Sequence, residues 1–248
     1  MFTREEVRAS AALAAEGVAE ALWPTRCAVC DVPGEALCPR CRRRLPYLDQ
    51  LTACPICGAA WGKGICCECN RETLRQRGME RFPLDACIAA TRLESDTRRI
   101  VVAYKDRGER RLAHAMARCM ADAMPPHWRR PDERSLIVPI PARREAVARR
   151  GFDHMRLIAK ELQGITGLPV AYALESNRSH DQRALGARSR QQNMAGSFRV
   201  VRRYALGTRG RLILIDDVMT TGATLFAAAD ALRERGAETV CGLTFTRA

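Results

Sequence analysis

The sequence lacks three features that would place it in particular classes of protein. No apolar run approaches the ~20 residues of a membrane-spanning helix, so we expect no membrane insertion. The apolar part of the N-terminal region is short and alanine-rich, and Glu5, Glu6, Glu16 and Glu20 interrupt the region. This pattern is unlike a signal peptide and predicts a cytoplasmic protein. Aromatic residues make up only 5% of the 248 residues, which leaves few side chains for stacking on nucleobases.

Lysine is also scarce, although the chain is basic. Only Lys63, Lys105 and Lys160 are lysines, so 38 of the 41 basic residues are arginines, and the formal net charge is +13. Residues 1–80 contain 11 Lys and Arg against 10 Asp and Glu, whereas residues 81–248 contain 30 against 18. The basic surplus therefore lies after residue 80, and it suits a polyanionic small substrate, a nucleic acid, or both.

Cysteine, in contrast, is concentrated in one segment and occurs in pairs. The pairs are Cys27 and Cys30, Cys38 and Cys41, Cys54 and Cys57, and Cys66 and Cys69. Each pair presents two thiolates on a tight turn, and two pairs complete a tetrahedral metal site. We therefore expect two structural Zn²⁺ ions, held most simply by consecutive pairs, and we expect metal binding to fold this segment.

Several alternatives stay open for these cysteines. The spacing also allows the first and third pairs to share one ion, and it allows Cys67 to replace Cys66. Iron competes with zinc at sites made only of thiolates. A disulfide framework fits less well, because the chain has no export signal. The basic cluster at 40–44 makes the segment equally compatible with DNA contact and with docking of a protein partner.

The stretch 211–224, which reads RLILIDDVMTTGAT, is the most informative part of the sequence. Residues 212–215 form an apolar run typical of a strand buried on both faces of a parallel sheet, and we expect the strand to end at Asp216 and Asp217. A turn of small residues then leads into a helix; its residues are Thr220, Thr221, Gly222, Ala223 and Thr224. The free backbone N–H groups of such a turn and of the helix N-terminus bind anions.

The paired acids need a different partner, because carboxylates do not bind phosphate. Sugar hydroxyls or a Mg²⁺ ion beside the phosphate would suit them. Together, a phosphate, vicinal hydroxyls and a metal describe a phosphorylated ribose. The turn is not a Walker A loop, since it has no GxxxxGK[ST] pattern and no lysine. The simpler alternative is an ordinary strand, turn and helix in which the two acids only cap the helix.

The strand, the Asp-Asp pair and the TTGAT turn together resemble the PRPP-binding signature of type I phosphoribosyltransferases. The resemblance implies an α/β fold with a parallel sheet flanked by helices, and Mg²⁺ bound with PRPP. It also implies that an early loop binds pyrophosphate, the alternative being an ordinary solvated basic loop. Arg107 is a secondary candidate, and the main candidates are Tyr104 and Lys105. We expect the preceding helix to be capped by Asp96 and to end before these two residues.

Two further basic regions are candidates for binding the pyrophosphate group. Arg143 and Arg150 follow a second apolar strand at 136–141. Arg190 lies in the basic segment 176–198, which we expect to act as a flexible lid over pyrophosphate or as an arm that grips DNA. Between these regions, we expect His154 to be a surface residue at the start of a helix that ends near Gly164.

The order of the motifs is similar to that of the ComF family of competence-associated proteins, which includes GntX-type members. Paired CxxC units lead to Tyr-Lys, then to VPIPARR and RRGFDH, then to the pattern from Arg178 to Phe198, then to LILIDDVMTTGAT. The resemblance covers nearly the whole chain from Cys27 onward; one departure is Asp153, where asparagine is expected. It implies a double zinc-ribbon module at 26–72 and a phosphoribosyltransferase-type domain at 82–248. Separately, the capping box of Thr3 and Glu6 and the helical spacing that follows, ended by Pro24, predict an N-terminal helix at 1–25.

Two functional hypotheses follow from the motifs and the resemblance. As an enzyme, the protein would bind the 5-phosphate of PRPP in the TTGAT turn and the ribose or Mg²⁺ at Asp216 and Asp217, and Lys105 would stabilise the departing pyrophosphate. The sequence does not identify the acceptor. As a binding protein without turnover, it would sense PRPP or handle single-stranded DNA during DNA uptake. Its partners would then include a competence helicase or other DNA-uptake proteins.

Overall fold

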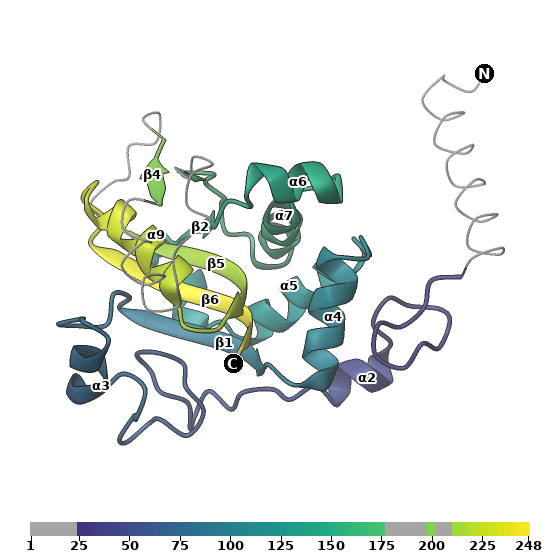
Figure 1. Ribbon diagram of the computed structural model, residues 1–248, viewed down its shortest axis with the longest axis horizontal. Helices are drawn as coiled ribbons and strands as arrows, with labels where there is room; N and C mark the ends of the chain where they lie inside the picture. The colour runs from purple at the N-terminus through teal and green to yellow at the C-terminus, as the bar shows by residue number, and fades with distance from the viewer. Residues whose placement is uncertain (1–23, 177–196, 202–209) are drawn as a thin grey trace. The chain divides into compact units, whose positions relative to one another are not determined.

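The computed structural model describes residues 24–176, 197–201 and 210–248 (Figure 1). The N-terminal helix expected within 1–25 and most of the basic segment that contains Arg190 lie outside these residues. The chain divides into two compact units, Met1–Leu45 and Pro46–Ala248. The division falls between the second and third cysteine pairs, and the boundaries of a module at 26–72 stay a prediction.

The described part of the first unit is organised around its four cysteines. The N–H of Cys27 donates to the carbonyl of Val32, and the N–H of Ala28 donates to that of Ala36, which closes a tight loop around the first pair. Helix α2, Pro39–Arg43, begins after Cys38, whose sulfur accepts a hydrogen bond from the N–H of Cys41. A proline suits this first helical position, because the N–H that it lacks has no partner inside a helix.

The second unit is built on a four-stranded parallel sheet in the order β1-β6-β5-β2. The strands are β1 Ala86–Arg92, β2 Leu136–Pro139, β5 Arg211–Met219 and β6 Thr239–Arg247. At the centre, Leu214 lies opposite Val138 of β2 and Gly242 of β6. The continuous apolar runs of these strands fit a parallel sheet that is covered on both faces.

The remaining elements of this unit are short helices and a small ribbon. The helices are α3 Arg71–Gln76, α4 Ser95–Lys105, α5 Leu112–Ala123, α6 Arg144–Arg150, α7 His154–Thr166 and α9 Ala223–Arg233, with 3₁₀ turns η1 Pro126–Arg129 and η2 Pro131–Glu133. Strands β3 Leu174–Ser176 and β4 Phe198–Val200 form an antiparallel pair. Among these described helices, none combines the length and the apolar content that crossing a bilayer requires.

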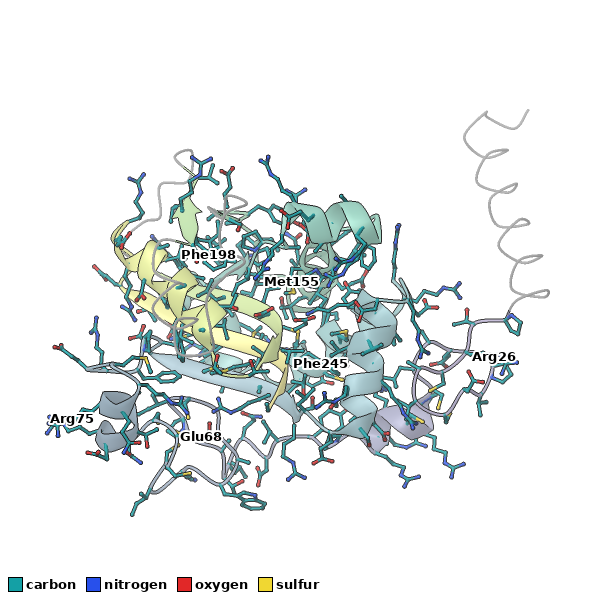
Figure 2. All side chains as sticks on the ribbon, in the orientation of Figure 1. Arg26, Glu68, Arg75, Met155, Phe198 and Phe245 are labelled. Atoms are coloured by element: carbon teal, nitrogen blue, oxygen red, sulfur yellow. The ribbon has the colours of Figure 1, made fainter. Side chains whose placement is uncertain are left out.

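Helices cover both faces of the sheet. Helices α5 and α7 pack on each other and contact the strands from one face, whereas α9 contacts β5, β6 and the β3–β4 ribbon (Figure 1). Leu212 and Leu214 of β5 share a core cluster with Phe226 of α9. Because side chains alternate along a strand, Ile213, Ile215 and Asp217 point to the opposite face. The core includes Met155 of α7 and Phe245 of β6 (Figure 2).

The boundaries of three elements differ from the expectations. Strand β5 continues through the two carboxylates to Met219, because β6 pairs with it as far as Arg247. Helix α4 begins at Ser95, capped by the reciprocal contact of Glu94 with Thr97 instead of by Asp96, and it includes Tyr104 and Lys105. Helix α7 passes the expected end near Gly164 and stops at Gly167, whose φ of +74° ends the helix.

Candidate functional site

The turn after β5 is shaped by Gly222. Its φ is +79°, and a Cβ at this position would lie 2.5 Å from Cζ of Phe226 and 2.9 Å from Cε of Met219. Any other residue would therefore combine backbone strain with a collision. Gly222 is also the N-cap of α9, whose first N–H groups have no partner within the helix.

The surroundings of this helix N-terminus fit an anion. Thr220 and Thr221 are exposed, and Thr224 is half-buried. The N–H of Ala223 makes only a long hydrogen bond of 3.4 Å to the hydroxyl of Thr221. Hydroxyl donors, backbone N–H groups and the positive end of the helix dipole thus meet at one accessible point, which can bind a phosphate group.

The carboxylate of Asp217 lies buried next to a cation. Its side chain is 2% exposed, and its Oδ2 atom lies 2.5 Å from Nζ of Lys105, the last residue of α4. The same oxygen is 3.8 Å from Nε2 of His154, at the start of α7. The structure thus brings together Lys105 and Asp217, two residues that are 112 positions apart in the sequence.

Asp216 faces the other side of β5, because neighbouring residues of a strand alternate. Its Oδ1 atom accepts a hydrogen bond of 2.9 Å from the N–H of Asp217. Burial and the adjacent Asp217 raise the pKa of Asp216 to about 8, and Lys105 partly opposes this effect. A bound cation would favour the ionised form of Asp216. Carboxylate oxygens beside an anion-binding turn are suitable ligands for Mg²⁺.

His154 begins α7 as expected, but the expectation that it lies at the surface was wrong, because this residue is buried. Its Nδ1 atom lies 3.3 Å from an NH1 atom of Arg150, and its carbonyl accepts a hydrogen bond of 2.5 Å from the hydroxyl of Tyr104. Burial lowers the pKa of His154 to about 4, with Asp217 opposing and Lys105 adding to the decrease, so the ring is neutral at neutral pH. Asp153 caps α7 through the N–H groups of Met155 and Arg156 and so holds His154 at the helix start.

The other candidate residues differ in whether they contact the cluster of Lys105, His154 and Asp217. Tyr104 is fully buried and supports the start of α7 through its hydrogen bond to His154. Arg150 ends α6 and reaches the cluster through His154, whereas Arg143 precedes α6 in the same connection between β2 and α7. Arg190 lies outside the described residues. The sequence contains a signal for His154, the GFDH motif, but this signal does not indicate burial.

The cysteines gather in two groups of four, each made of consecutive pairs. Within each group, the sulfur atoms all lie within 4.8 Å of one another; the groups are Cys27, Cys30, Cys38 and Cys41, and Cys54, Cys57, Cys66 and Cys69. The interleaved arrangement is therefore not the one that forms. The exposed Cys67 belongs to neither group.

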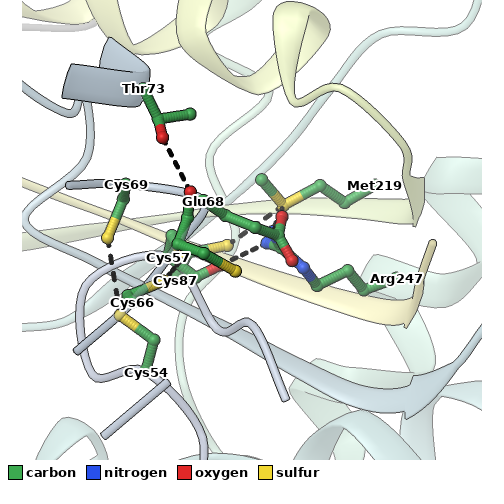
Figure 3. Close-up of polar contacts among 10 residues, drawn as sticks. Cys54, Cys57, Cys66, Glu68, Cys69, Thr73, Cys87, Met219 and Arg247 are labelled. Atoms are coloured by element: carbon green, nitrogen blue, oxygen red, sulfur yellow. Dashed lines mark hydrogen bonds and ion pairs between the residues drawn. The ribbon is translucent and has the colours of Figure 1, made fainter. Parts of the chain in front are cut away.

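The spacing of the sulfur atoms fits a zinc ion. A tetrahedral site with Zn–S bonds of about 2.3 Å has sulfur atoms about 3.8 Å apart. The Sγ–Sγ distance is 3.8 Å from Cys30 to Cys38 in the first group. In the second group it is 3.6 Å from Cys54 to Cys69 and 3.5 Å from Cys57 to Cys66 (Figure 3). Both groups can hold a zinc ion.

The protonation of the thiols is expected to depend on whether a metal ion is bound. Burial and the neighbouring thiols of Cys54 and Cys66 raise the pKa of Cys69 to about 12, although Cys57 opposes them. Burial likewise raises the pKa of Cys57 far above its usual range, although Arg247 opposes the effect. Without a metal, four thiolates would not coexist at neutral pH in so small a volume, whereas a bound Zn²⁺ ion favours the thiolate form.

We expect two zinc ions per chain, one in each group of cysteines. Replacing Cys66 with serine should reduce the count to one, because the second group loses a ligand. Replacing the adjacent Cys67 should leave the count at two, since its sulfur lies outside both groups. Elemental analysis of the purified variants measures both the count and the identity of the metal. Loss of an ion from Cys67→Ser but not from Cys66→Ser would contradict this grouping.

Comparison with known proteins identifies the larger unit. The phosphoribosyl transferase domain family matches residues 146–245, which include Asp216, Asp217 and the turn at Gly222. With its parallel sheet flanked by helices, the chain thus contains a phosphoribosyltransferase-type domain, as predicted, together with an N-terminal cysteine-rich segment compatible with a zinc ribbon.

Two curated relatives narrow the class further. The chain is 27% identical over 217 residues to "Competence protein ComFC" of Bacillus subtilis (strain 168), covering 87% of this chain and 85% of the relative. It is 29% identical over 134 residues to "Competence protein F" of Haemophilus influenzae (strain ATCC 51907 / DSM 11121 / KW20 / Rd), covering 53% of this chain and 58% of the relative. The chain is thus similar to competence proteins of the ComF type, in agreement with the resemblance found in the sequence.

A solved structure also shows a distant likeness. It is titled "Structure of the allosteric regulatory enzyme of purine biosynthesis", and it is 19% identical to this chain with a TM-score of 0.36. The match covers 53% of this chain and 25% of that chain.

Proposed function

We propose that the domain binds PRPP together with Mg²⁺ and transfers its phosphoribosyl group to an acceptor. One observation supports the proposal most directly. The turn that requires Gly222 and the ion pair of Asp217 with Lys105 both lie at the carboxyl end of β5, and Gly222 follows Asp217 by five residues. In parallel α/β sheets, ligands bind at the carboxyl ends of the strands, which is where these groups lie.

Each part of PRPP has a proposed set of contacts. The 5-phosphate would accept hydrogen bonds from the turn and from the start of α9; the residues are Thr220, Thr221, Gly222, Ala223 and Thr224. Asp216 and Asp217 would accept hydrogen bonds from the ribose hydroxyls, directly or through Mg²⁺. When bound, Mg²⁺ would neutralise charge on the pyrophosphate group.

Lys105 would act on the pyrophosphate group. In the free protein its ammonium group pairs with Asp217, and both side chains lie at the proposed position of the ribose. During transfer, the bond from the anomeric carbon to the pyrophosphate oxygen breaks, and a bond from that carbon to the acceptor forms. Lys105 would stabilise the negative charge that develops on pyrophosphate, with further cationic contacts proposed from Arg143, Arg150 and Arg190. Tyr104 is a proposed neighbour of this site.

A second candidate function is binding of PRPP or single-stranded DNA without turnover. Both curated relatives are named as competence proteins, and the basic surplus of the chain lies within residues 81–248. A surface with that charge would bind a nucleic acid through its phosphates. In this alternative the protein would act in DNA uptake, with a competence helicase or other uptake proteins as partners.

Release of pyrophosphate from PRPP tests the proposal. The assay uses the zinc-loaded protein with Mg²⁺ and a panel of nucleobases and related acceptors. Thr221→Arg would fill the phosphate position, and the double change of Asp216→Asn and Asp217→Asn would remove the ribose and metal contacts. We expect both to reduce PRPP binding by more than about 100-fold, since charge-assisted hydrogen bonds contribute about 1.5–3 kcal/mol each.

Asp122→Asn provides the matched control for the loss of a carboxylate. This acid is exposed on α5, where it pairs with Arg118. It should leave PRPP binding unchanged. Acceptor-dependent turnover that the site variants abolish would identify a transferase and its acceptor. Saturable PRPP binding without turnover, lost in the same variants, would favour the binding protein. Absence of PRPP binding to folded wild-type protein would refute both versions of the site.

A further inference from the structure

The last arginine of the chain connects the second cysteine group to the end of β5. Arg247 ends β6, and it is only 5% exposed. Its guanidinium donates to the carbonyl of Cys57, pairs with the carboxylate of Glu68, and contacts Sδ of Met219 at 3.4 Å (Figure 3). A single buried side chain thus touches three segments that are distant in the sequence.

Two of these partners belong to the loops that carry the cysteine ligands. Cys57 is itself a member of the second group, and Glu68 lies between Cys67 and Cys69. The loop around Glu68 is held further by the hydroxyl of Thr73, which donates to the carbonyl of Cys67 at 2.7 Å. A metal ion that fixes the four sulfur atoms would therefore also fix the two oxygen acceptors of Arg247.

The third partner leads to the anion-binding turn. Met219 is the last residue of β5, and its carbonyl accepts a hydrogen bond of 2.9 Å from the N–H of Ala248. Its Sδ atom also accepts a contact of 3.5 Å from the thiol of Cys87. Its Cε atom lies 2.9 Å from the point that a Cβ of Gly222 would occupy, so Met219 packs directly beneath the turn.

The buried guanidinium of Arg247 links the two ends of this series of contacts. If the loops that carry the second cysteine group became disordered, Arg247 would lose both the carboxylate of Glu68 and the carbonyl of Cys57 as partners. Its Nε atom already has no hydrogen-bond partner among the described residues. A buried charge without partners is strongly unfavourable, so Arg247 would move toward water and leave Met219 without its support.

We propose that Arg247 is a positioning residue that couples metal binding at Cys54, Cys57, Cys66 and Cys69 to the conformation of the anion-binding turn. Zinc at the second group then strengthens binding of the 5-phosphate of PRPP, an effect that rests on the function proposed above. Coupling between two binding sites is reciprocal, so bound PRPP also raises the affinity of the second group for zinc, and we expect this gain to appear as slower release of the ion.

Arg247→Met and Arg233→Met form a matched pair for the first test. Arg233 also bridges segments, through Asp85 and the carbonyls of Pro83 and Glu238, but at the opposite end of α9 from the turn. Calorimetric titration with Mg²⁺ and PRPP measures affinity. A colorimetric chelator measures how fast each of the two zinc ions is released, with and without PRPP.

In the wild type and in Arg233→Met, PRPP should slow release of one zinc ion about tenfold, which is typical of coupled sites. Arg247→Met should still bind two zinc ions, bind PRPP about tenfold more weakly, and show no protection of zinc by PRPP. Equal affinities and equal protection in Arg247→Met and the wild type would overturn the proposal.

Amide hydrogen exchange tests the coupling without relying on PRPP. Loss of zinc from the second group in Cys57→Ser should increase exchange in 219–226 at least about tenfold and leave α7 protected, since local opening can occur below global unfolding. If Cys57→Ser does not fold, Glu68→Gln replaces it in the test. This variant keeps all four sulfur ligands, and it should give a smaller increase in exchange. Unchanged exchange at the turn in both variants would overturn the coupling. Faster exchange in a protein that does not bind PRPP would support the coupling and refute the proposed function.

Discussion

Replacing Gly222 with alanine is expected to destabilise the larger unit by about 3 kcal/mol and to weaken PRPP binding at least about tenfold. A left-handed backbone conformation costs a residue with a Cβ about 1–2 kcal/mol. The new methyl group would also lie 2.5 Å from the ring of Phe226 and 2.9 Å from Met219, and such overpacking costs about 1–3 kcal/mol. To relieve the collision, either the side chains of Phe226 and Met219 or the turn must shift, and a shift of the turn would move its N–H groups away from the proposed phosphate position.

Gly167→Ala separates the two contributions. Gly167 has a similar φ of +74°, but nothing lies within 4 Å of its Cβ position. This variant should lose only about 1 kcal/mol and keep its affinity for PRPP. Urea-induced unfolding measures the stability of both variants, and calorimetry measures their affinity. If both changes had the same effect, the packing of Phe226 and Met219 against the turn would not matter.

The central strand and the turn after it were predictable because their signals are local, whereas the fold class followed from the resemblance to phosphoribosyltransferases. The run 212–215 is apolar without alternation, which is typical of a buried parallel strand, and the structure places it at the centre of the sheet. Consecutive pairing of the cysteines was the simplest expectation from their spacing, although the spacing also allowed an interleaved arrangement. In these cases, residues close in the sequence determine the local structure.

The remaining features depend on contacts between distant residues. Strand β5 extends past Asp216 because β6 continues to pair with it, and no pattern near Asp216 indicates that pairing. His154 is buried because α4 and β5 bring Tyr104 and Asp217 against it. Arg247 resembles an ordinary charged terminus in the sequence, and only the fold brings it to Cys57 and Glu68.

The pairing of Lys105 with Asp217 has a measurable consequence for stability. Lys105→Met should destabilise the protein by about 2 kcal/mol, since it leaves a buried carboxylate without its cation. The full cost of breaking a buried pair is about 3–5 kcal/mol, and partial access to water reduces it here, because the lysine side chain is 22% exposed. His154 cannot substitute as the cation at neutral pH, because burial lowers its pKa to about 4.

A double-mutant cycle isolates this interaction. Asp217→Asn alone should cost less than Lys105→Met, because the released ammonium group can turn toward water while the released carboxylate cannot. The double variant should be more stable than Lys105→Met by about 1 kcal/mol or more, since both charges are then gone. Urea unfolding at pH 7.5 without PRPP measures all four proteins, and simple additivity would exclude a coupled pair. Under the proposed function, all three variants should also bind PRPP weakly, because the same two groups would then stabilise the free protein and contact PRPP.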